Sequence, residues 1–430
     1  MFWLIETNDQ FNWLKNSSYK EVFVEIIPNN PYQHPVDNSI IAIYVKPLKA
    51  HKGYMLPFFH SECYSLEKEE VIKWLKSLDK IYVRDKKEFL HYIILKQLID
   101  ITFHNPPYIP PQTTAHKVLY RRYPALNTVN QIVPITKHYE VCEQMYDDLE
   151  TRINNPVNSF YNNKCTLAFN AIERNGLKIN KNEFSNKFKQ HQESASIKFI
   201  EEFIYTNYNL KTLTRRPSNT FGGINYAALP KENGSRKAFI PRNDVLIEFD
   251  ISAYHPSLAA KLVGFNFYDK DIHKSFADMY QVDYTVSKEL TFKQLYGGVF
   301  EKYKNLEYFR KIEEYKTNLF EEFIVEGKIK CPISGYEFKK QELDNMNKHK
   351  LFNYVLQNLE TSLNVLIILD ILKVLRKKNT KLVLYTYDAF LFDVDLGEKE
   401  EIKQIKNVFK KYGLQVKVNK GINYDFRGDK

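Results

Sequence analysis

The chain has 430 residues, which is too long for one ordinary hydrophobic core and suits two or three domains. Hydrophobic residues make up 43% of it and aromatic residues 15%, a composition that excludes an intrinsically disordered protein. The 62 Lys and Arg against 52 Asp and Glu give a net charge of +10, which favours an acidic partner such as nucleic acid, although a solvated lysine-rich surface would have the same balance.

The cysteines and the apolar runs exclude several further classes of protein. The 4 cysteines lie far apart without Cys-x-x-Cys spacing, so neither a disulfide framework nor a zinc site is indicated. The first residues lack the pattern of a signal peptide, and the longest apolar run, 363–375, is too short to span a bilayer. We therefore expect a cytoplasmic protein without a membrane partner.

Prolines and strand patterns characterise the N-terminal third, which holds 11 of the 17 prolines before residue 135. Apolar strand-like runs occupy 22–27, 39–45 and 80–83, and helical periodicity occupies 67–76 and 86–99. The proline-rich stretch 104–112 is typical of a loop or linker, since each proline fixes φ and removes a donor. We predict a small mixed domain over 1–135.

From about residue 137 onward, long helical patterns dominate. They cover 137–153, 181–206, 271–281, 285–296, 303–326 and 342–377. Strand-like segments interrupt them at 244–251 and 381–394, with a shorter one near 413–418. This pattern predicts a large α+β domain over 136–430.

Two of the predicted strands end in an aspartate. Asp250 closes the run VLIEFD, and Asp388 closes LVLYTYD. For one such strand alone, the ordinary interpretation is a turn residue or a helix cap. If the two strands are neighbours in one sheet, however, the paired carboxylates are suited to two Mg²⁺ ions, which stabilise the attacking and leaving oxygens of a phosphoryl transfer.

A helical segment between these strands carries a cation and two aromatic rings on one face. Lys288, Phe292 and Tyr296 recur at every fourth position and are followed by a Gly-Gly pair. This face suits a triphosphate, a flat base and a close-lying template strand. An aromatic stripe at helical spacing is more often part of a core, and a lone lysine is more often solvated.

The ordered set of these motifs resembles the polymerase I type of DNA polymerases (family A). DISAYHPSLAAKLVG (250–264) is similar to motif A, DIHKSFADMY (271–280) to the family's Asp-Ile-His segment, and Lys288-x3-Phe292-x3-Tyr296-Gly297 to motif B. YTYDAFLFDV (385–394) occupies the place of motif C. Flanking segments at 167–180, 215–241, 327–338, 352–363 and 414–426 also resemble the family, so the resemblance covers roughly 165–426.

The resemblance implies an α+β right-hand fold preceded by a small α/β RNase H-like domain of the 3′–5′ exonuclease type. The thumb would lie at about 150–215, the palm at about 216–264 and 346–430, and the fingers at about 265–345. The exonuclease-like domain would occupy 1–135.

The resemblance also implies roles for individual residues. Asp250, Asp388 and the carbonyl of Ile251 would bind two Mg²⁺ ions, for which Mn²⁺ can substitute. Lys288 would neutralise developing charge, and the incoming nucleotide would contact His273, Lys288, Phe292, His255 and Ile251. DNA would contact Tyr296 and Gly297, with Arg216, Asn353 and Gln357 in the minor groove, where acceptor contacts are nearly independent of sequence.

The chain departs from the family pattern at three positions of the polymerase motifs. Tyr284 stands where motif B has Arg, His255 stands where motif A has the Glu that blocks ribose 2′-hydroxyls, and Ala389 replaces the second acid of motif C. In the N-terminal domain, the Asp-x-Glu of an exonuclease is represented only by Glu25, followed by Ile27. Proofreading is therefore not expected.

The leading hypothesis is a monomeric, template-directed DNA polymerase without proofreading, of phage or mobile-element type. Its partners would be a DNA primer–template, dNTPs and replication accessory proteins. One alternative is an enzyme that accepts ribonucleotides, as a primase or RNA polymerase does, which His255 supports. Another is a catalytically weak DNA-binding replication protein on the same fold, which Tyr284 and Ala389 support.

Overall fold

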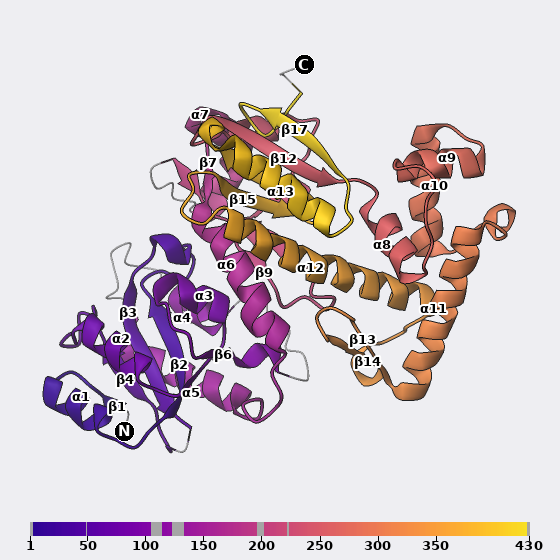
Figure 1. Cartoon of the computed structure of the whole chain (residues 1–430). Coiled ribbons are helices and arrows are strands. Elements are labelled where there is room, and N and C mark those ends of the chain that lie inside the picture. Colours follow the sequence, from indigo (N-terminus) through magenta and orange to yellow (C-terminus); the bar gives the residue numbers. More distant parts are fainter. Residues whose placement is uncertain are drawn as a thin grey trace. The chain divides into compact units, whose positions relative to one another are not determined.

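The computed structural model describes residues 3–48, 50–104, 114–122, 133–195, 202–221 and 223–427 (Figure 1). Most of the proline-rich stretch 104–112 therefore lies outside the described residues. The chain forms two compact units, Met1–Gly176 with Gln190–Asn207, and Leu177–Lys189 with Tyr208–Lys430. The assignment of 1–135 to an exonuclease-like domain, and of 136–430 to polymerase subdomains, stays a prediction.

The first unit is built on a six-stranded mixed sheet. Its order is β1 (Trp3–Leu4), β4 (Tyr54–Pro57), β3 (Ile40–Pro47), β2 (Glu21–Pro28), β5 (Lys80–Val83) and β6 (Leu98–Asp100). The strands β4, β3 and β2 are antiparallel neighbours, whereas β5 and β6 continue the sheet parallel to β2. Buried residues fill β2 and β3 almost from end to end, as expected for strands covered on both faces.

Helices cover both faces of this sheet, and the alternation along β2 sorts its side chains between them. Val22 and Val24 belong to one apolar cluster, together with helices α1 (Asn8–Lys15), α2 (Lys68–Lys76) and α3 (Lys86–Tyr92). Phe23 and Ile27 belong to a second cluster with α5 (Ile135–Glu150). Helices α4 (Ala115–Arg122) and α6 (Thr166–Asn175) also belong to this unit.

The helix predicted over 86–99 is shorter than expected. It ends at Tyr92 because Ile93 adopts extended backbone, and the chain then returns to pair with β5 as β6. The helix predicted over 181–206 is likewise shorter: α7 spans Lys181–Ala195, and a two-residue strand, β8, lies at Phe203–Ile204. In both places a strand follows where the apolar periodicity had indicated more helix.

The second unit contains a four-stranded antiparallel sheet. Its order is β15 (Lys381–Thr386), β16 (Ala389–Val394), β12 (Val245–Ile251) and β17 (Val416–Gly421). The segment predicted as one strand over 381–394 is a hairpin, β15–β16, and Tyr387 and Asp388 form its turn. Helix α13 (Lys399–Lys411) packs on one face of this sheet, where the rings of Phe249 and Phe409 stack at 5.6 Å.

The predicted helical pattern of the second unit matches α9 (Ile272–Tyr280), α10 (Tyr284–Gly297), α11 (Glu307–Glu326) and α12 (Lys348–Val374) closely. Helix α8 (Tyr254–Leu262) was not predicted. Buried aromatic rings of α9 and α11, including Phe276 and Tyr308 at 5.1 Å, form the core between them. A small hairpin, β13 (Lys328–Lys330) with β14 (Glu337–Lys339), follows α11.

Helix α12 is the central helix of the second unit in Figure 1. By length and composition it is the one described helix that could cross a membrane, but 72% of its apolar window is buried inside the protein. Its sequence is thus that of a core helix. Short strands, β9 (Tyr208–Asn209), β10 (Ser218–Phe221) and β11 (Ile224–Asn225), form a separate three-stranded sheet.

Candidate active site

The two predicted aspartates lie side by side at one end of the four-stranded sheet. In the β12–β16 pairing Asp250 stands opposite Ala389, the residue after Asp388, and the Ile251 amide donates to the Asp388 carbonyl at 2.8 Å. Both adjoining turns hold a non-glycine residue in the left-handed region, Ala253 at φ 46° and Tyr387 at φ 66°. Such strained residues are typical of functional sites, because the surrounding structure must hold them in place.

The electrostatics of this pair favour a bound cation. The pKa of Asp388 is raised to about 6 by the enclosing protein, which removes water from the carboxylate, and by the charges of Asp250 and Glu360. Burial also raises the pKa of Asp250, although Lys231 and Lys417 oppose it. Neither carboxylate forms an ion pair with another described residue. Two adjacent oxygen donors in this state fit the preference of Mg²⁺.

The two carboxylates face a large cleft of about 1020 Å³. One wall is formed by the sheet, with Asp250, Asp388 and Lys417, and another by α9 and α10, with His273, Lys288 and Phe292. The cleft is roomy enough for a nucleotide, since small-molecule sites are commonly about 300–1,000 Å³. The structure thus gathers most of the predicted catalytic and nucleotide-binding residues in one place.

Helix α10 presents its predicted face only in part to the cleft. Phe292 and Tyr296 stack at 6.0 Å, and His273 lies 6.3 Å from the Phe292 ring. Lys288 and Phe292 line the cleft, whereas Tyr296 does not. Tyr284, at the position of the missing arginine, donates to Asp271 at 3.1 Å and lies under the Lys288 ammonium at 4.5 Å.

A buried chain of polar groups lies behind the cleft. The Tyr296 hydroxyl contacts Nδ1 of His255, whose Nε2 lies 3.2 Å from the Glu360 carboxylate. Nε of Arg216 lies 3.0 Å from the same Glu360 oxygen. His255, which was predicted to contact the nucleotide, is not among the residues that line the cleft. It contacts the Tyr296 hydroxyl instead.

Glu360 is the functional candidate that sequence reasoning missed. It lies on α12 with 1% of its surface exposed, and its carboxylate contacts Arg216 and His255 without aligned hydrogen-bond geometry. Arg216 also stacks on the Tyr387 ring at 3.7 Å, next to Asp388. A glutamate inside an apolar helix pattern is a usable signal, since buried acids occur almost only with partners.

The three residues predicted to lie in the minor groove have partners within the second unit. Arg216 pairs with Glu360, Asn353 donates to the Tyr296 carbonyl at 3.4 Å, and Gln357 accepts from Thr214 at 3.0 Å. Gly297 ends α10, and a Cβ placed there would meet nothing within 4 Å. The structure thus places all four near α10 and α12, and their contact with DNA stays a prediction.

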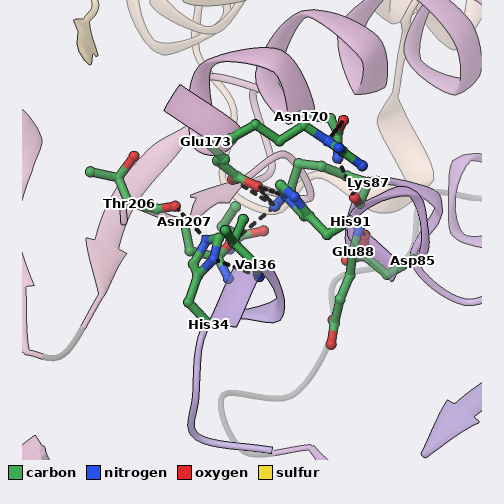
Figure 2. A network of polar contacts seen from close by, with 12 residues as sticks. His34, Val36, Asp85, Lys87, Glu88, His91, Asn170, Glu173, Thr206 and Asn207 are labelled. Atoms are coloured by element: carbon green, nitrogen blue, oxygen red, sulfur yellow. Dashed lines mark hydrogen bonds and ion pairs between the residues drawn. The ribbon is translucent and has the colours of Figure 1, made fainter. Parts of the chain in front are cut away.

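The first unit holds a different polar cluster, shown in Figure 2. His34, His91 and Glu173 are the one described group of three side chains with the spacing of metal ligands. Lys87, however, donates to both carboxylate oxygens of Glu173 at 2.7 and 2.8 Å, and His91 contacts the same carboxylate at 2.8 Å. The cationic partner of Glu173 is therefore an ammonium group of the protein itself.

His34 is also committed to protein partners. Its Nδ1 accepts from the Val36 amide at 3.2 Å, so its Nε2 carries the proton that is donated to the Thr206 carbonyl at 3.0 Å. Burial, with Lys87 and His91 nearby, lowers the pKa of His34 to about 3. We conclude that this cluster is a neutralised, structural charge network.

Comparisons with known proteins bear on the fold. No protein-family model matches the chain, and no curated protein matches it by sequence. Among solved structures, the chain is similar to the POL domain of Pol1 from M. smegmatis, in complex with a DNA primer–template and dNTP. The TM-score is 0.69 over 100% of both chains, at 14% sequence identity. This similarity confirms the predicted mixed polymerase fold, whereas the exonuclease-like nature of the N-terminal domain stays a prediction.

Proposed function

We propose that this chain is a template-directed DNA polymerase of the polymerase I type, which adds dNTPs to a primer 3′-hydroxyl. The observation that carries the proposal is the pairing of β12 with β16, which brings Asp250 and Asp388 together on a cleft that Lys288 also lines. The similarity in fold to a polymerase domain supports it. Its partners would be a primer–template and dNTPs in the cytoplasm, and it would act as a monomer.

The residues present define what each would do. Asp250, Asp388 and the Ile251 carbonyl would hold two Mg²⁺ ions, which supply charge stabilisation to the attacking and leaving oxygens. Lys288 and His273 on α10 and α9 would hold the triphosphate by charge and hydrogen bonds. Phe292, with 36% of its surface exposed on the cleft, would pack against the sugar and base.

The first unit supports the absence of proofreading. Glu25, the acid retained at the expected exonuclease position, lies 3.0 Å from the Arg84 guanidinium and 3.4 Å from His116. Burial would raise the pKa of Glu25, but Arg84 and His116 bring it below its ordinary value. The carboxylate is thus ionised and already paired with a protein cation. Ile27, at the second acid position of the Asp-x-Glu pattern, and Phe89, where the resembled family would have another Asp, are buried apolar residues.

The first test is primer extension with Mg²⁺, comparing the wild type with Asp388→Asn and supplying dNTPs and NTPs separately. We expect extension by the wild type with dNTPs, and a loss of at least about a hundredfold in the variant, because an electrostatic anchor of the transition state is removed. DNA affinity should hold, since the change removes negative charge from the cleft. Asp370→Asn, which changes an acid on α12 that pairs with Lys373 and Lys411, is the matched control.

The outcomes separate the alternatives. DNA binding without extension by any nucleotide would favour a non-catalytic replication protein, which Tyr284 and Ala389 also allow. Extension with NTPs as efficient as with dNTPs would favour the ribonucleotide-accepting alternative. Extension that survives Asp388→Asn would remove Asp388 from the metal site.

A further inference from the structure

The edge strand of the four-stranded sheet brings a lysine to the acid pair. β17 pairs with β12 so that Lys417 stands directly opposite Asp250, and Asn419 opposite Glu248. Directly paired residues project from the same face of a sheet, so Lys417 shares the face of Asp250. It is exposed and lines the cleft, and sequence reasoning attached no role to it.

Two further cations, Lys231 and Arg236, lie in the segment that precedes β12, and together with Lys417 they oppose the rise in the pKa of Asp250. Arg236 is anchored: its guanidinium donates to the Leu229 carbonyl at 3.0 Å and lies over the Tyr424 ring at 4.4 Å.

Lys231 and Lys417 differ from Arg236 in having no such anchor. Both are exposed, and neither forms an ion pair with a residue in the described part of the chain. Glu248, the other acid of β12 on this face, is buried and accepts from Asn419 at 3.1 Å. Asp250 is thus the β12 acid that faces the cleft beside Lys417, and Lys417 forms no ion pair with a described residue that would keep it from an acidic partner.

We propose that Lys417 binds the sugar–phosphate backbone of the primer strand next to its 3′ end. The inference rests on the proposed function and adds a binding site to it. Lysine acts as a mobile point charge toward phosphate, which suits a contact that must accept every sequence and be released at each step.

The arrangement of the cleft favours the primer over the triphosphate as the ligand. In phosphoryl transfer the attacking and leaving oxygens lie roughly in line on opposite sides of the phosphorus. Cations for the leaving pyrophosphate and for the primer strand therefore belong on different walls of the cleft. Lys288 and His273 lie on α10 and α9, whereas Lys417 lies on β17, which Figure 1 shows well away from α10.

The test measures DNA binding and nucleotide use separately for Lys417→Ala. Fluorescence anisotropy with a labelled primer–template gives the Kd and its dependence on salt, and single-nucleotide extension gives the KM for dNTP. Lys420→Ala is the matched control. Lys420 lies on β17 like Lys417, but it is paired with Ile247 of β12 and therefore points to the other face of the sheet.

We expect Lys417→Ala to raise the Kd for DNA several-fold and to lower the salt slope of log Kd by about one, as for the loss of one phosphate contact. The KM for dNTP should stay unchanged, and Lys420→Ala should resemble the wild type. A primer with one neutral methylphosphonate near its 3′ end should weaken binding by the wild type. The same primer should have little further effect on Lys417→Ala, because the contact is already lost.

Two outcomes overturn the inference. If Lys417→Ala raises the KM for dNTP and leaves the Kd for DNA unchanged, the lysine serves the triphosphate. If both quantities and the methylphosphonate effect match those of the wild type, the lysine is an ordinary solvated residue. Failure of the proposed function is a separate result, namely no extension by the wild type. If the Kd for DNA still depends on Lys417 in that case, the lysine binds DNA although the chain is not a polymerase.

Discussion

At the scale of single residues, Glu360 connects two parts of the candidate site. It contacts His255, which holds Tyr296 on α10, and Arg216, which stacks on Tyr387 beside Asp388. Its negative charge is also one of the causes, after burial and Asp250, that raise the pKa of Asp388 to about 6. A single buried acid thus acts on both the helix that we propose faces the nucleotide and the proposed metal ligand.

Glu360→Gln tests this connection through pH. Asp388 loses its proton as pH rises through about 6, and only the ionised carboxylate binds Mg²⁺ well. The Mg²⁺ concentration needed for half-maximal extension by the wild type should therefore decrease as pH is raised from about 5.5 to about 7.5. Removing the charge of Glu360 lowers the pKa of Asp388, and this fall should then occur at lower pH. Mg²⁺ titrations of primer extension across that range measure it.

The control for that variant is Asp370→Asn, which removes an acid from the C-terminal part of the same helix. Asp370 pairs with Lys373 on α12 and Lys411 on α13, and its replacement should leave the pH dependence of the Mg²⁺ requirement unchanged. An equal loss of activity at every pH in Glu360→Gln would indicate that Glu360 only stabilises the fold.

The sequence predicts single residues well where a motif carries them and poorly where a spatial partner does. Asp250, Asp388 and Lys288 belong to ordered motifs, and the structure brings all three to one cleft. Glu360 contacts Arg216, which lies 144 residues earlier in the chain, and Lys417 stands opposite Asp250, which lies 167 residues earlier. No local pattern contains such a pairing.

At the scale of elements, the buried charge network of Figure 2 joins α3 to α6 within the first unit. The side chains of Lys87 and Glu173 are 6% and 0% exposed, respectively. Burial would raise the pKa of Glu173, but Lys87 and His91 bring it below its ordinary value of 4.5. The ionised Glu173 carboxylate therefore stabilises the folded first unit above pH 4.5, and this contribution is lost as pH falls through the lower pKa that Glu173 has in the folded state.

Breaking this pair should be costly. We expect Lys87→Met to destabilise the first unit by about 3–5 kcal/mol, because it leaves a buried carboxylate without its charge partner. The double variant Lys87→Met with Glu173→Gln should lose less than the sum of the two single variants. Hydrogen exchange of the α3 and α6 amides measures the effect in this unit.

A surface pair provides the comparison for that measurement. Lys403 and Glu400 on α13 are 73% and 66% exposed, and Lys403→Met should cost under about 1 kcal/mol. If Lys87→Met behaves like Lys403→Met, then water or another group replaces the ammonium without loss, and the network does not hold the two helices.

Elements were predicted correctly where one periodicity runs unbroken, and wrongly where the chain reverses within an apolar run. Helices α9, α10 and α11 lie within the predicted ranges to a few residues. The run 381–394 conceals a hairpin because its turn, Tyr387–Asp388, lacks glycine, and Tyr387 reaches a φ of 66° only because tertiary contacts hold it. Propensity cannot show a turn that packing imposes.

At the scale of the whole molecule, the candidate metal ligands of the second unit and two buried acids of the first unit, Glu25 and Glu173, are in opposite electrostatic states. In the second unit Asp250 and Asp388 face a cleft without ion pairs to other described residues. In the first unit Glu25 and Glu173 are buried against Arg84 and Lys87, respectively. Metal-dependent phosphoryl chemistry needs carboxylates that are free to take a divalent cation, so we expect it only in the second unit.

This division predicts the fate of a mismatched primer. With Mg²⁺ and no dNTP, the chain should leave a mismatched 3′ end at full length over hours, since Glu25 and Glu173 of the first unit are already paired with protein cations and are not available to hold metal ions. Added dNTPs should extend the mismatch slowly rather than replace it. Gel analysis of a 5′-labelled primer follows both steps, and Asp250→Ala is the informative variant. Mg²⁺-dependent shortening that persists in Asp250→Ala would show a nuclease outside the β12–β16 site, and the Glu25–Arg84 pair would then have to open during the reaction.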